Sequence, residues 1–217
     1  MKEFRTYVFD LDGTLLDTLD DLTASVNHAL TVYGMPTRNR EEVRQFVGNG
    51  VRQLIRRSVG PDCKEEIMEQ ALETFRAHYS KHNIDKTKPY DGIIQMLRLL
   101  KERGKKVAVV SNKFDTATKN LCRHFFGQMV DVAIGESENV RRKPAPDSVI
   151  EALRCLDEGP EGAVYIGDSD VDIETAKAAG LPCISVSWGF RDKPFLISHG
   201  AQTIISSPSC LVINLDK

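Results

Sequence analysis

Two carboxylates separated by a single residue, Asp10 and Asp12, are the side chains of this sequence best suited to chemistry. They follow residues 7–9, which are apolar and strand-forming, and they precede Gly13, which is typical of a turn at a strand end. Side chains two residues apart on a strand point the same way, so both carboxylates can face one site. Adjacent anions repel unless a cation or an electrophile balances them, so the pair predicts a site for a metal, a phosphate or both. The alternative for an isolated pair is a helix cap or a polar strand end.

Further polar clusters accompany later apolar runs of the chain. Residues 107–110 form a run of the buried-strand type and precede Ser111, and residues 163–166 form another and precede Gly167-Asp168. A basic loop punctuated by prolines carries Lys143 between them. Because parallel strands end at the same edge of a sheet, where open α/β folds bind ligands, we expect these clusters to converge on the aspartate pair.

The composition limits the classes of protein to which the chain can belong. Its 217 residues suffice for one substantial core and a smaller accessory unit. A net charge of −2 gives no electrostatic case for a nucleic-acid partner. No apolar run approaches the length needed to span a bilayer, so we expect a cytoplasmic protein without a membrane partner. The five cysteines are widely spaced and lack a CxxC pair, which argues against a disulfide framework or a structural zinc site. Three of them lie in apolar contexts and are expected to be buried: Cys122, Cys155 and Cys183.

The elements that must position these residues fall into two patterns. Residues 18–84 are helical throughout, with apolar residues at three- and four-residue spacing. From Pro89 onward, helices and strands alternate at short intervals, which indicates a parallel sheet with right-handed crossovers. We therefore expect an α/β fold with a Rossmann-like, doubly wound parallel sheet. Residues 1–17 and 85–217 would form this core, and residues 18–84 would be an all-helical domain inserted after the first strand.

The motifs, taken in order, resemble the signature of the haloacid dehalogenase-like hydrolase superfamily. These are Asp-x-Asp, Ser111, Lys143 and the Gly-Asp-x-x-x-Asp that runs from Gly167 to Asp172, and the resemblance covers essentially the whole chain. It implies that the helical insertion is a cap domain. It also implies that Asp10 is a nucleophile that forms an aspartyl-phosphate, while Asp12 protonates the leaving group and then activates water. The presence of the second aspartate favours phosphate esters over carbon–halogen substrates.

The same resemblance implies roles for the other polar residues. Ser111 and Lys143 would bind the transferring phosphoryl group, with Asn112 beside them. Mg²⁺ would be the cofactor, held by the carboxylates of Asp10 and Asp168 and by the backbone carbonyl of Asp12. Asp172 would orient a metal-bound water or Lys143. The alternatives are a helix-capping Ser111 and a solvated Lys143. Solvent exposure is the expected state of three neighbouring basic residues, Lys113, Arg141 and Arg142, and Asp170 is expected to be solvated or to cap a helix.

Within the superfamily the chain is most similar to bacterial phosphoglycolate phosphatases. Residues 9–18, 47–52 and 187–191 carry this similarity. It implies hydrolysis of a small phosphate ester, with 2-phosphoglycolate as the first candidate, by a monomer or homodimer. Pyrophosphate, sugar phosphates and nucleoside monophosphates stay open, as does a phosphoglucomutase. A phosphonate-cleaving enzyme would need a cap lysine, and Lys64 has no evident site around it. A non-enzymatic phosphate-binding protein would usually have lost one of the catalytic carboxylates.

Substrate selection is expected to depend on the helical insertion. Gly48, Asn49 and Gly50 form a flexible turn, and the helix after it would present free backbone N–H groups to an anion. Arg52 in the first turn of that helix is suited to bind a substrate carboxylate through two parallel hydrogen bonds. The alternative is that Arg52 belongs to a solvated basic face together with Arg56 and Arg57.

Overall fold

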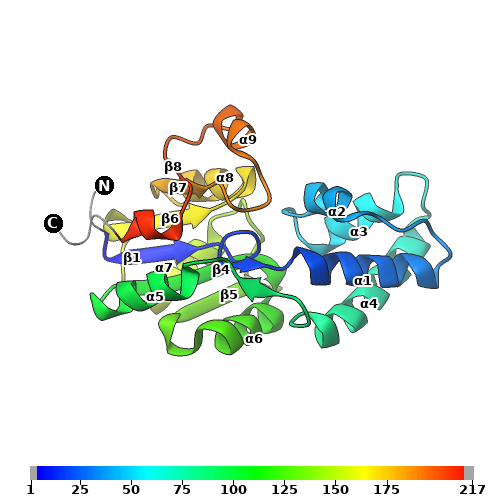
Figure 1. The fold of residues 1–217 in the computed structure, drawn as a ribbon, viewed down its shortest axis with the longest axis horizontal. Coiled ribbons are helices and arrows are strands. Elements are labelled where there is room, and N and C mark those ends of the chain that lie inside the picture. The colour runs from blue at the N-terminus through cyan, green and yellow to red at the C-terminus, as the bar shows by residue number, and fades with distance from the viewer. Residues whose placement is uncertain (1–3, 213–217) are drawn as a thin grey trace. The chain divides into compact units, whose positions relative to one another are not determined.

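The computed structural model describes residues 4–212 and divides the chain into two compact units. One unit is Asp17–Lys88, and the other consists of the described residues up to Leu16 and from Pro89 onward. The second unit contains a six-stranded sheet in the order β5-β4-β1-β6-β7-β8, in which every neighbouring pair is parallel (Figure 1). Its strands are β1 (Thr6–Phe9), β4 (Lys106–Phe114), β5 (Val132–Glu136), β6 (Ala163–Gly167), β7 (Cys183–Val186) and β8 (Ile204–Ile205). A separate two-stranded sheet pairs β2 (Leu16–Asp17) with β3 (Lys88–Pro89). The predicted fold class is confirmed.

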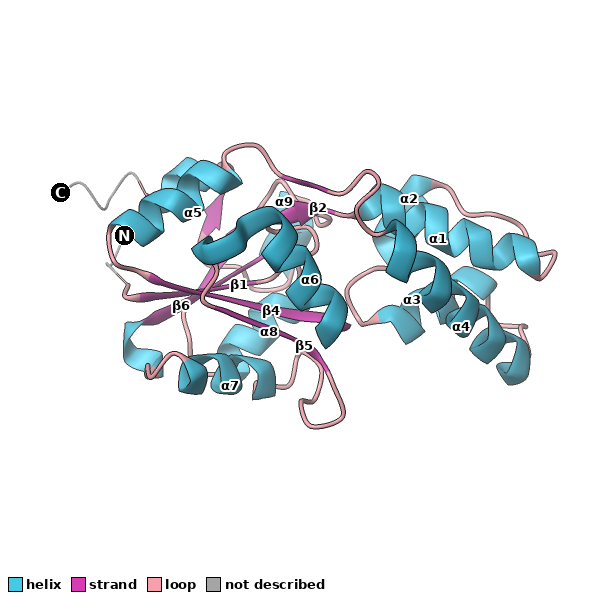
Figure 2. Cartoon of the chain, turned by 90° about the horizontal axis from the view of Figure 1, so that it is seen from below, coloured by secondary structure: helices cyan, strands magenta, loops and turns pink. Residues whose placement is uncertain are grey.

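Helices cover both faces of the six-stranded sheet, as expected for right-handed crossovers (Figure 2). Side chains alternate along β1, so Tyr7 and Phe9 pack in the core cluster with α5 and α6, whereas Val8 packs in the cluster with α7 and α8. All three side chains are at most 2% exposed. Each fully buried side chain of this size stabilises the fold by roughly 1.5–3 kcal/mol. The helices of this unit are α5 (Ile93–Glu102), α6 (Asp115–Phe126), α7 (Asp147–Cys155), α8 (Asp170–Ala178) and α9 (Lys193–Ser198).

The register of the central strands determines which polar residues meet at the carboxyl edge of the sheet. Phe9 at the end of β1 lies opposite Val109 on one side and Ile166 on the other. β4 continues beyond the apolar run of residues 107–110 as far as Phe114. It therefore extends beyond the end of β1, and its pairing with β5 is irregular between Val110 and Phe114. Such irregularities turn side chains toward new directions near functional sites.

The helical unit contains four helices built on the periodicity of its sequence. They are α1 (Leu19–Val32), α2 (Arg40–Phe46), α3 (Val51–Val59) and α4 (Glu65–His82). Leu22 and Val26 of α1 and Leu72 and Phe75 of α4 are at most 3% exposed. Buried Asp21 accepts hydrogen bonds from the backbone N–H groups of residues 86 and 87 and from the Thr87 hydroxyl. These bonds pair the buried carboxylate with donors from the end of the unit.

The cysteines follow the sequence analysis with two exceptions, Cys155 and Cys183, of which Cys183 is only partly buried. All five cysteines are free, and Cys122 is buried. The expectation for Cys155 is wrong, because this residue is the last of α7 and is exposed. Among the described residues, no helix has the length and apolar character that crossing a bilayer requires.

Candidate active site

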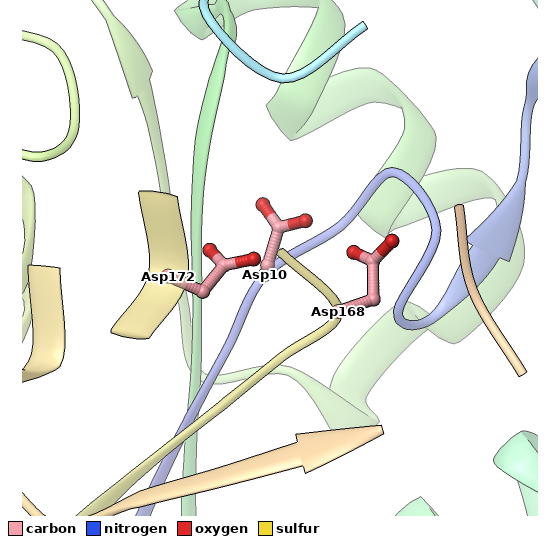
Figure 3. A group of neighbouring side chains, drawn as sticks. All are labelled: Asp10, Asp168 and Asp172. Carbon is pink, nitrogen blue, oxygen red and sulfur yellow. The ribbon is translucent and has the colours of Figure 1, made fainter. Parts of the chain in front are cut away.

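Three aspartates converge at the carboxyl edge of the central strands. Asp10 follows β1 directly, Asp168 follows β6, and Asp172 lies in the first turn of α8. Figure 3 shows Asp10 between the other two, with the side chain of Asp172 directed toward it. Carboxylate oxygens of all three lie within 4.8 Å of one another. The chain order reverses around β1 at this edge, which is where open α/β sheets bind ligands.

Lys143 is the cation at the centre of this cluster. Its Nζ lies 2.6 Å from Oδ1 of Asp10, 2.8 Å from Oδ1 of Asp172 and 2.9 Å from the hydroxyl of Tyr165. The lysine side chain is 4% exposed. Its three N–H donors thus have three oxygen acceptors, and the alternative of a solvated loop lysine is wrong.

Asp172 uses both carboxylate oxygens within the protein. Its Oδ1 accepts from Lys143 and from Tyr165, while its Oδ2 accepts from the backbone N–H and the hydroxyl of Ser169. Ser169 is the N-cap of α8 and forms a capping box with Asp172. Of the two alternatives for Asp170, a solvated position or a helix cap, the cap is therefore wrong. Gly167 allows this arrangement, since a Cβ atom there would collide with the Asp172 side chain.

Asp168 is fixed by donors from two loops. Its Oδ1 accepts from the Thr14 hydroxyl at 3.1 Å, and its Oδ2 accepts from the backbone N–H of Phe190 at 2.7 Å. Gly13, with a φ of +93°, and Gly189 pack so closely against this carboxylate that any Cβ would collide with it. These contacts hold Asp168 in one orientation beside Asp10.

The protonation equilibria of the site indicate a deficit of positive charge. Burial raises the pKa of Asp10 well above its ordinary value, against the lowering influence of Lys143. Burial, followed by repulsion from Asp172, raises the pKa of Asp168 to about 7. Burial alone would lower the pKa of Lys143, but Asp10 and Asp172 raise it above its usual value. The two aspartates therefore remain short of compensating charge even though Lys143 is fully ionised.

The donor set of the cluster suits a hard divalent cation. Mg²⁺ prefers carboxylate oxygens and takes few protein ligands. Asp10 and Asp168 have the raised pKa values that a cation would reverse, whereas Asp172 already serves four donors. Asp10 and Asp168 thus fit a first coordination sphere, and Asp172 fits an outer position in which it orients Lys143.

Asp12 contacts the end of β4. Its Oδ1 lies 3.1 Å from Nζ of Lys113, and its Oδ2 is 3.4 Å from the hydroxyl of Ser111. The expectation of a solvated Lys113 is wrong, because its side chain is only 3% exposed. Arg141 and Arg142, by contrast, are exposed and form surface ion pairs with Asp147 and Glu136.

Asn112 lies between Ser111 and Lys113 on β4 but contacts the backbone of Lys143. Its side-chain Oδ1 accepts from the backbone N–H of Lys143, and its Nδ2 donates to the carbonyl of the same residue. Asn112 therefore fixes the backbone of the loop that carries Lys143. Direct phosphate binding by the Asn112 side chain stays a prediction.

The residues predicted to select the substrate lie in the helical unit. Gly50 is the N-cap of α3, with a φ of +82°, and Asn49 accepts a hydrogen bond from Arg57. Arg52, in the first turn of α3, forms ion pairs with Glu65 and Glu69. The structure thus places Arg52 in an ion-pair network of its own unit, and its role toward a substrate carboxylate stays a prediction.

Sequence reasoning missed three groups of the site. Tyr165 was interpreted only as part of an apolar strand, yet its buried hydroxyl contacts both Lys143 and Asp172. Burial, and then the charge of Asp172, raises the pKa of this phenol. Thr14 was part of the first motif but received no role, and Lys113 was interpreted as solvated. A polar group within an otherwise apolar strand was the signal available for Tyr165.

Comparisons with known proteins agree with this geometry. The family model of haloacid dehalogenase-like hydrolases matches residues 7–186. A phosphoglycolate phosphatase of Aquifex aeolicus is 35% identical, and the alignment covers 98% of this chain and 97% of that protein. Phosphoglycolate phosphatase 1 of Pseudomonas aeruginosa is 33% identical over 97% of this chain and 77% of its own length. The crystal structure of a candidate phosphoglycolate phosphatase from Lactobacillus delbrueckii subsp. bulgaricus superposes with a TM-score of 0.92 at 34% identity and covers 97% of each chain. The chain therefore belongs to the haloacid dehalogenase-like hydrolase family.

Proposed function

We propose that the protein is a phosphatase that hydrolyses a small organic phosphate monoester, with 2-phosphoglycolate as the first candidate. The observation that carries the proposal is the buried Lys143–Asp10 pair beside Asp168. In the proposal Asp10 is the nucleophile, Lys143 the phosphate-binding cation and Asp168 a metal ligand. The names of the most similar relatives support the substrate class. Family membership supports hydrolysis, although a shared fold alone does not establish a substrate.

In the first step Asp10 acts as the nucleophile. One of its carboxylate oxygens attacks phosphorus, the bond from phosphorus to the ester oxygen breaks, and its electron pair stays on the leaving oxygen. The carboxyl group of Asp12 gives its proton to that oxygen, so the alcohol leaves neutral. Lys143 donates to Asp10, and its positive charge offsets the negative charge that gathers at the transferring group.

In the second step water hydrolyses the aspartyl-phosphate. The carboxylate of Asp12 takes a proton from water while the water oxygen attacks phosphorus. The bond between phosphorus and the Asp10 oxygen breaks, which releases inorganic phosphate and restores the Asp10 carboxylate. Asp12 is then protonated again and ready for the next ester.

Mg²⁺ is the proposed cofactor, with Asp10, Asp168 and the backbone carbonyl of Asp12 as its protein ligands. When bound, it supplies the positive charge that the buried carboxylates lack and polarises the phosphoryl oxygens. Thr14 and Phe190 hold Asp168 ready for this role, and Asp172 holds Lys143. We further propose that the helical unit, residues 18–84 in the sequence analysis, selects the leaving group.

A phosphate-release assay over a panel of esters with Mg²⁺ tests the proposal. The panel contains 2-phosphoglycolate, p-nitrophenyl phosphate, sugar phosphates, nucleoside monophosphates and pyrophosphate. We expect stoichiometric release of phosphate and a preference for 2-phosphoglycolate. Transfer of the phosphoryl group to a sugar without phosphate release would indicate a mutase instead. The matched control is Asp10→Asn, which is nearly isosteric and should release no phosphate from any ester.

A further inference from the structure

Lys113 is a buried cation to which the proposed reaction assigns no role. Its side chain is 3% exposed, and its Nζ lies 3.1 Å from Oδ1 of Asp12. Taking an ammonium group out of water carries a large penalty, which a close carboxylate offsets. A buried lysine that pairs with partly buried Asp12 is thus a different feature from an exposed surface ion pair, which contributes little.

The length of β4 explains why the chain places a lysine there. Phe9, the last residue of β1, lies opposite Val109, and β4 continues for several residues beyond this point. The overhanging segment lies beside the loop that carries Asp10 and Asp12. Within it, Ser111 and Lys113 approach the two oxygens of Asp12, while Asn112 binds the backbone of Lys143.

Both carboxylate oxygens of Asp12 have a contact from β4. The ammonium of Lys113 approaches Oδ1, and the hydroxyl of Ser111 makes a long contact of 3.4 Å with Oδ2. A carboxyl group must present one oxygen to the leaving oxygen in a narrow range of angles to transfer a proton. The contacts from Ser111 and Lys113 restrict the two side-chain torsions of Asp12 that set the direction of that oxygen.

We propose that Lys113 is the positioning residue of Asp12 and that it holds the carboxyl group in line with the leaving oxygen. This inference rests on the proposed phosphatase function and on the acid role of Asp12 within it. It assigns no contact between Lys113 and the phosphoryl group. Lys113 acts on the reaction only through Asp12, so its loss should matter most where the leaving group needs a proton.

The experiment compares two esters whose leaving groups differ in how much they need a proton. An alkoxide leaves poorly without a proton, whereas p-nitrophenolate leaves readily as an anion. The kcat/KM value is measured with Mg²⁺ for the best alkyl ester of the panel and for p-nitrophenyl phosphate, because it excludes hydrolysis of the aspartyl-phosphate, which both esters share. The variants are Lys113→Met, Lys113→Arg, Asp12→Asn and the double variant Lys113→Met/Asp12→Asn. The matched control is Lys119→Met on the neighbouring helix α6, where Lys119 pairs with Asp115 on the surface.

We expect Lys113→Met to lower kcat/KM, which reports the steps up to release of the alcohol, by about a hundredfold on the alkyl ester and by about tenfold or less on p-nitrophenyl phosphate. Lys113→Arg should recover part of the loss because it keeps the charge. The double variant should be no slower than Asp12→Asn, since both substitutions act through one group. Lys119→Met should match the wild type.

Equal losses of kcat/KM on the two esters, or a further loss in the double variant, would overturn the inference. If Lys113→Met does not fold, the double variant, which removes both charges, and Lys113→Arg still decide the question. The outcomes also separate this inference from the proposed function. An unimpaired Asp12→Asn variant would contradict the acid role itself, whereas an impaired Asp12→Asn with an unimpaired Lys113→Met would contradict the role of Lys113 alone.

Discussion

Lys143 and Asp10 are 133 residues apart in the sequence, yet Nζ of the lysine lies 2.6 Å from Oδ1 of the aspartate in the buried centre of the site. The same ammonium contacts Asp172 and Tyr165, so its position is fixed from three directions. In the proposed mechanism, a fixed cation beside the attacking oxygen costs no reorganisation during phosphoryl transfer. Substitution of each residue in this arrangement should therefore have its own measurable effect on activity or stability.

Tyr165 is expected to support catalysis through Lys143. Tyr165→Phe keeps the aromatic ring and removes only the hydroxyl that contacts Lys143 and Asp172. We expect kcat to fall by about ten- to a hundredfold with a small change in KM, as is usual when a partner of a site residue is lost. Tyr7→Phe is the matched control, because Tyr7 is a buried tyrosine of β1 within the cluster of α5 and α6. Equal kinetics of the two variants would remove Tyr165 from the positioning of Lys143.

Asp168 predicts how stability depends on pH and Mg²⁺. Its pKa is raised from about 4 to about 7 in the folded protein, chiefly by burial. The protonated Asp168 contributes to the free energy of unfolding. This contribution is fully present below about pH 4 and is lost as pH rises toward 7, because the buried carboxylate must then ionise. Thermal unfolding of metal-free protein should therefore show a loss of stability over this range that Asp168→Asn reduces. At pH 7.5, Mg²⁺ at a hundred times its Kd should add about 2.7 kcal/mol.

The control for the metal effect is the same Asp168→Asn variant. It should unfold at a higher temperature than the metal-free wild type at pH 7.5, and it should respond weakly to Mg²⁺. An undiminished Mg²⁺ response in the variant would show that the cation binds elsewhere.

The structure shows why some of these features could be predicted and others could not. The order of the motifs and the rule that parallel strands end together were enough to predict that Asp10, Lys143 and Asp168 meet. The apolar periodicity likewise predicted the helices of the insertion. These inferences depend on local pattern and on topology, which the sequence carries directly.

The errors concern residues whose surroundings depend on strand register. Lys113 is buried because β4 extends past β1, and no hydropathy pattern reveals this overhang. The role of Tyr165 depends on a loop lysine that lies 22 residues away in sequence. Cys155 was expected to be buried, but it ends α7 on the exposed side. Local apolar context does not determine such three-dimensional relationships.

Arg52 is expected to distinguish substrates by their leaving groups. Arg52→Ala should lower kcat/KM for 2-phosphoglycolate by about tenfold or more, because a guanidinium binds a carboxylate through paired, charge-assisted hydrogen bonds. It should change the value for p-nitrophenyl phosphate much less. Arg56→Ala is the matched control, since Arg56 lies on the same helix and also pairs with Glu65. If both variants behave alike on both esters, Arg52 serves only the ion-pair network of Glu65 and Glu69.

Three histidines of the helical unit predict a loss of stability in acid. The ring of His78 stacks on His28 of α1 at 4.1 Å and on His82 at 4.3 Å, and its Nδ1 contacts the Ser25 hydroxyl. Burial, followed by repulsion from His28 and His82, lowers the pKa of His78, while Asp85 opposes the shift.

A lowered histidine pKa contributes stability that is present above about pH 6.5 and is lost as pH falls through the folded value. We expect the unfolding temperature to fall between pH 7.5 and 5.5, and His78→Gln to reduce this fall. His124→Gln, a substitution at an exposed histidine of α6, should leave it unchanged. An identical pH response of the wild type and His78→Gln would disprove the role of the stack.

The covalent role of Asp10 is the central claim, and acid-quench trapping of the phosphorylated protein tests it most directly. The Asp12→Asn variant is mixed with ³²P-labelled ester and Mg²⁺, quenched in acid within one turnover and digested, and the labelled peptide is identified. We predict close to one phosphoryl group per chain on the peptide that contains Asp10, and none in Asp10→Asn, which should also release no phosphate. Phosphate release by the wild type without any labelled protein, or label that persists in Asp10→Asn, would contradict the account.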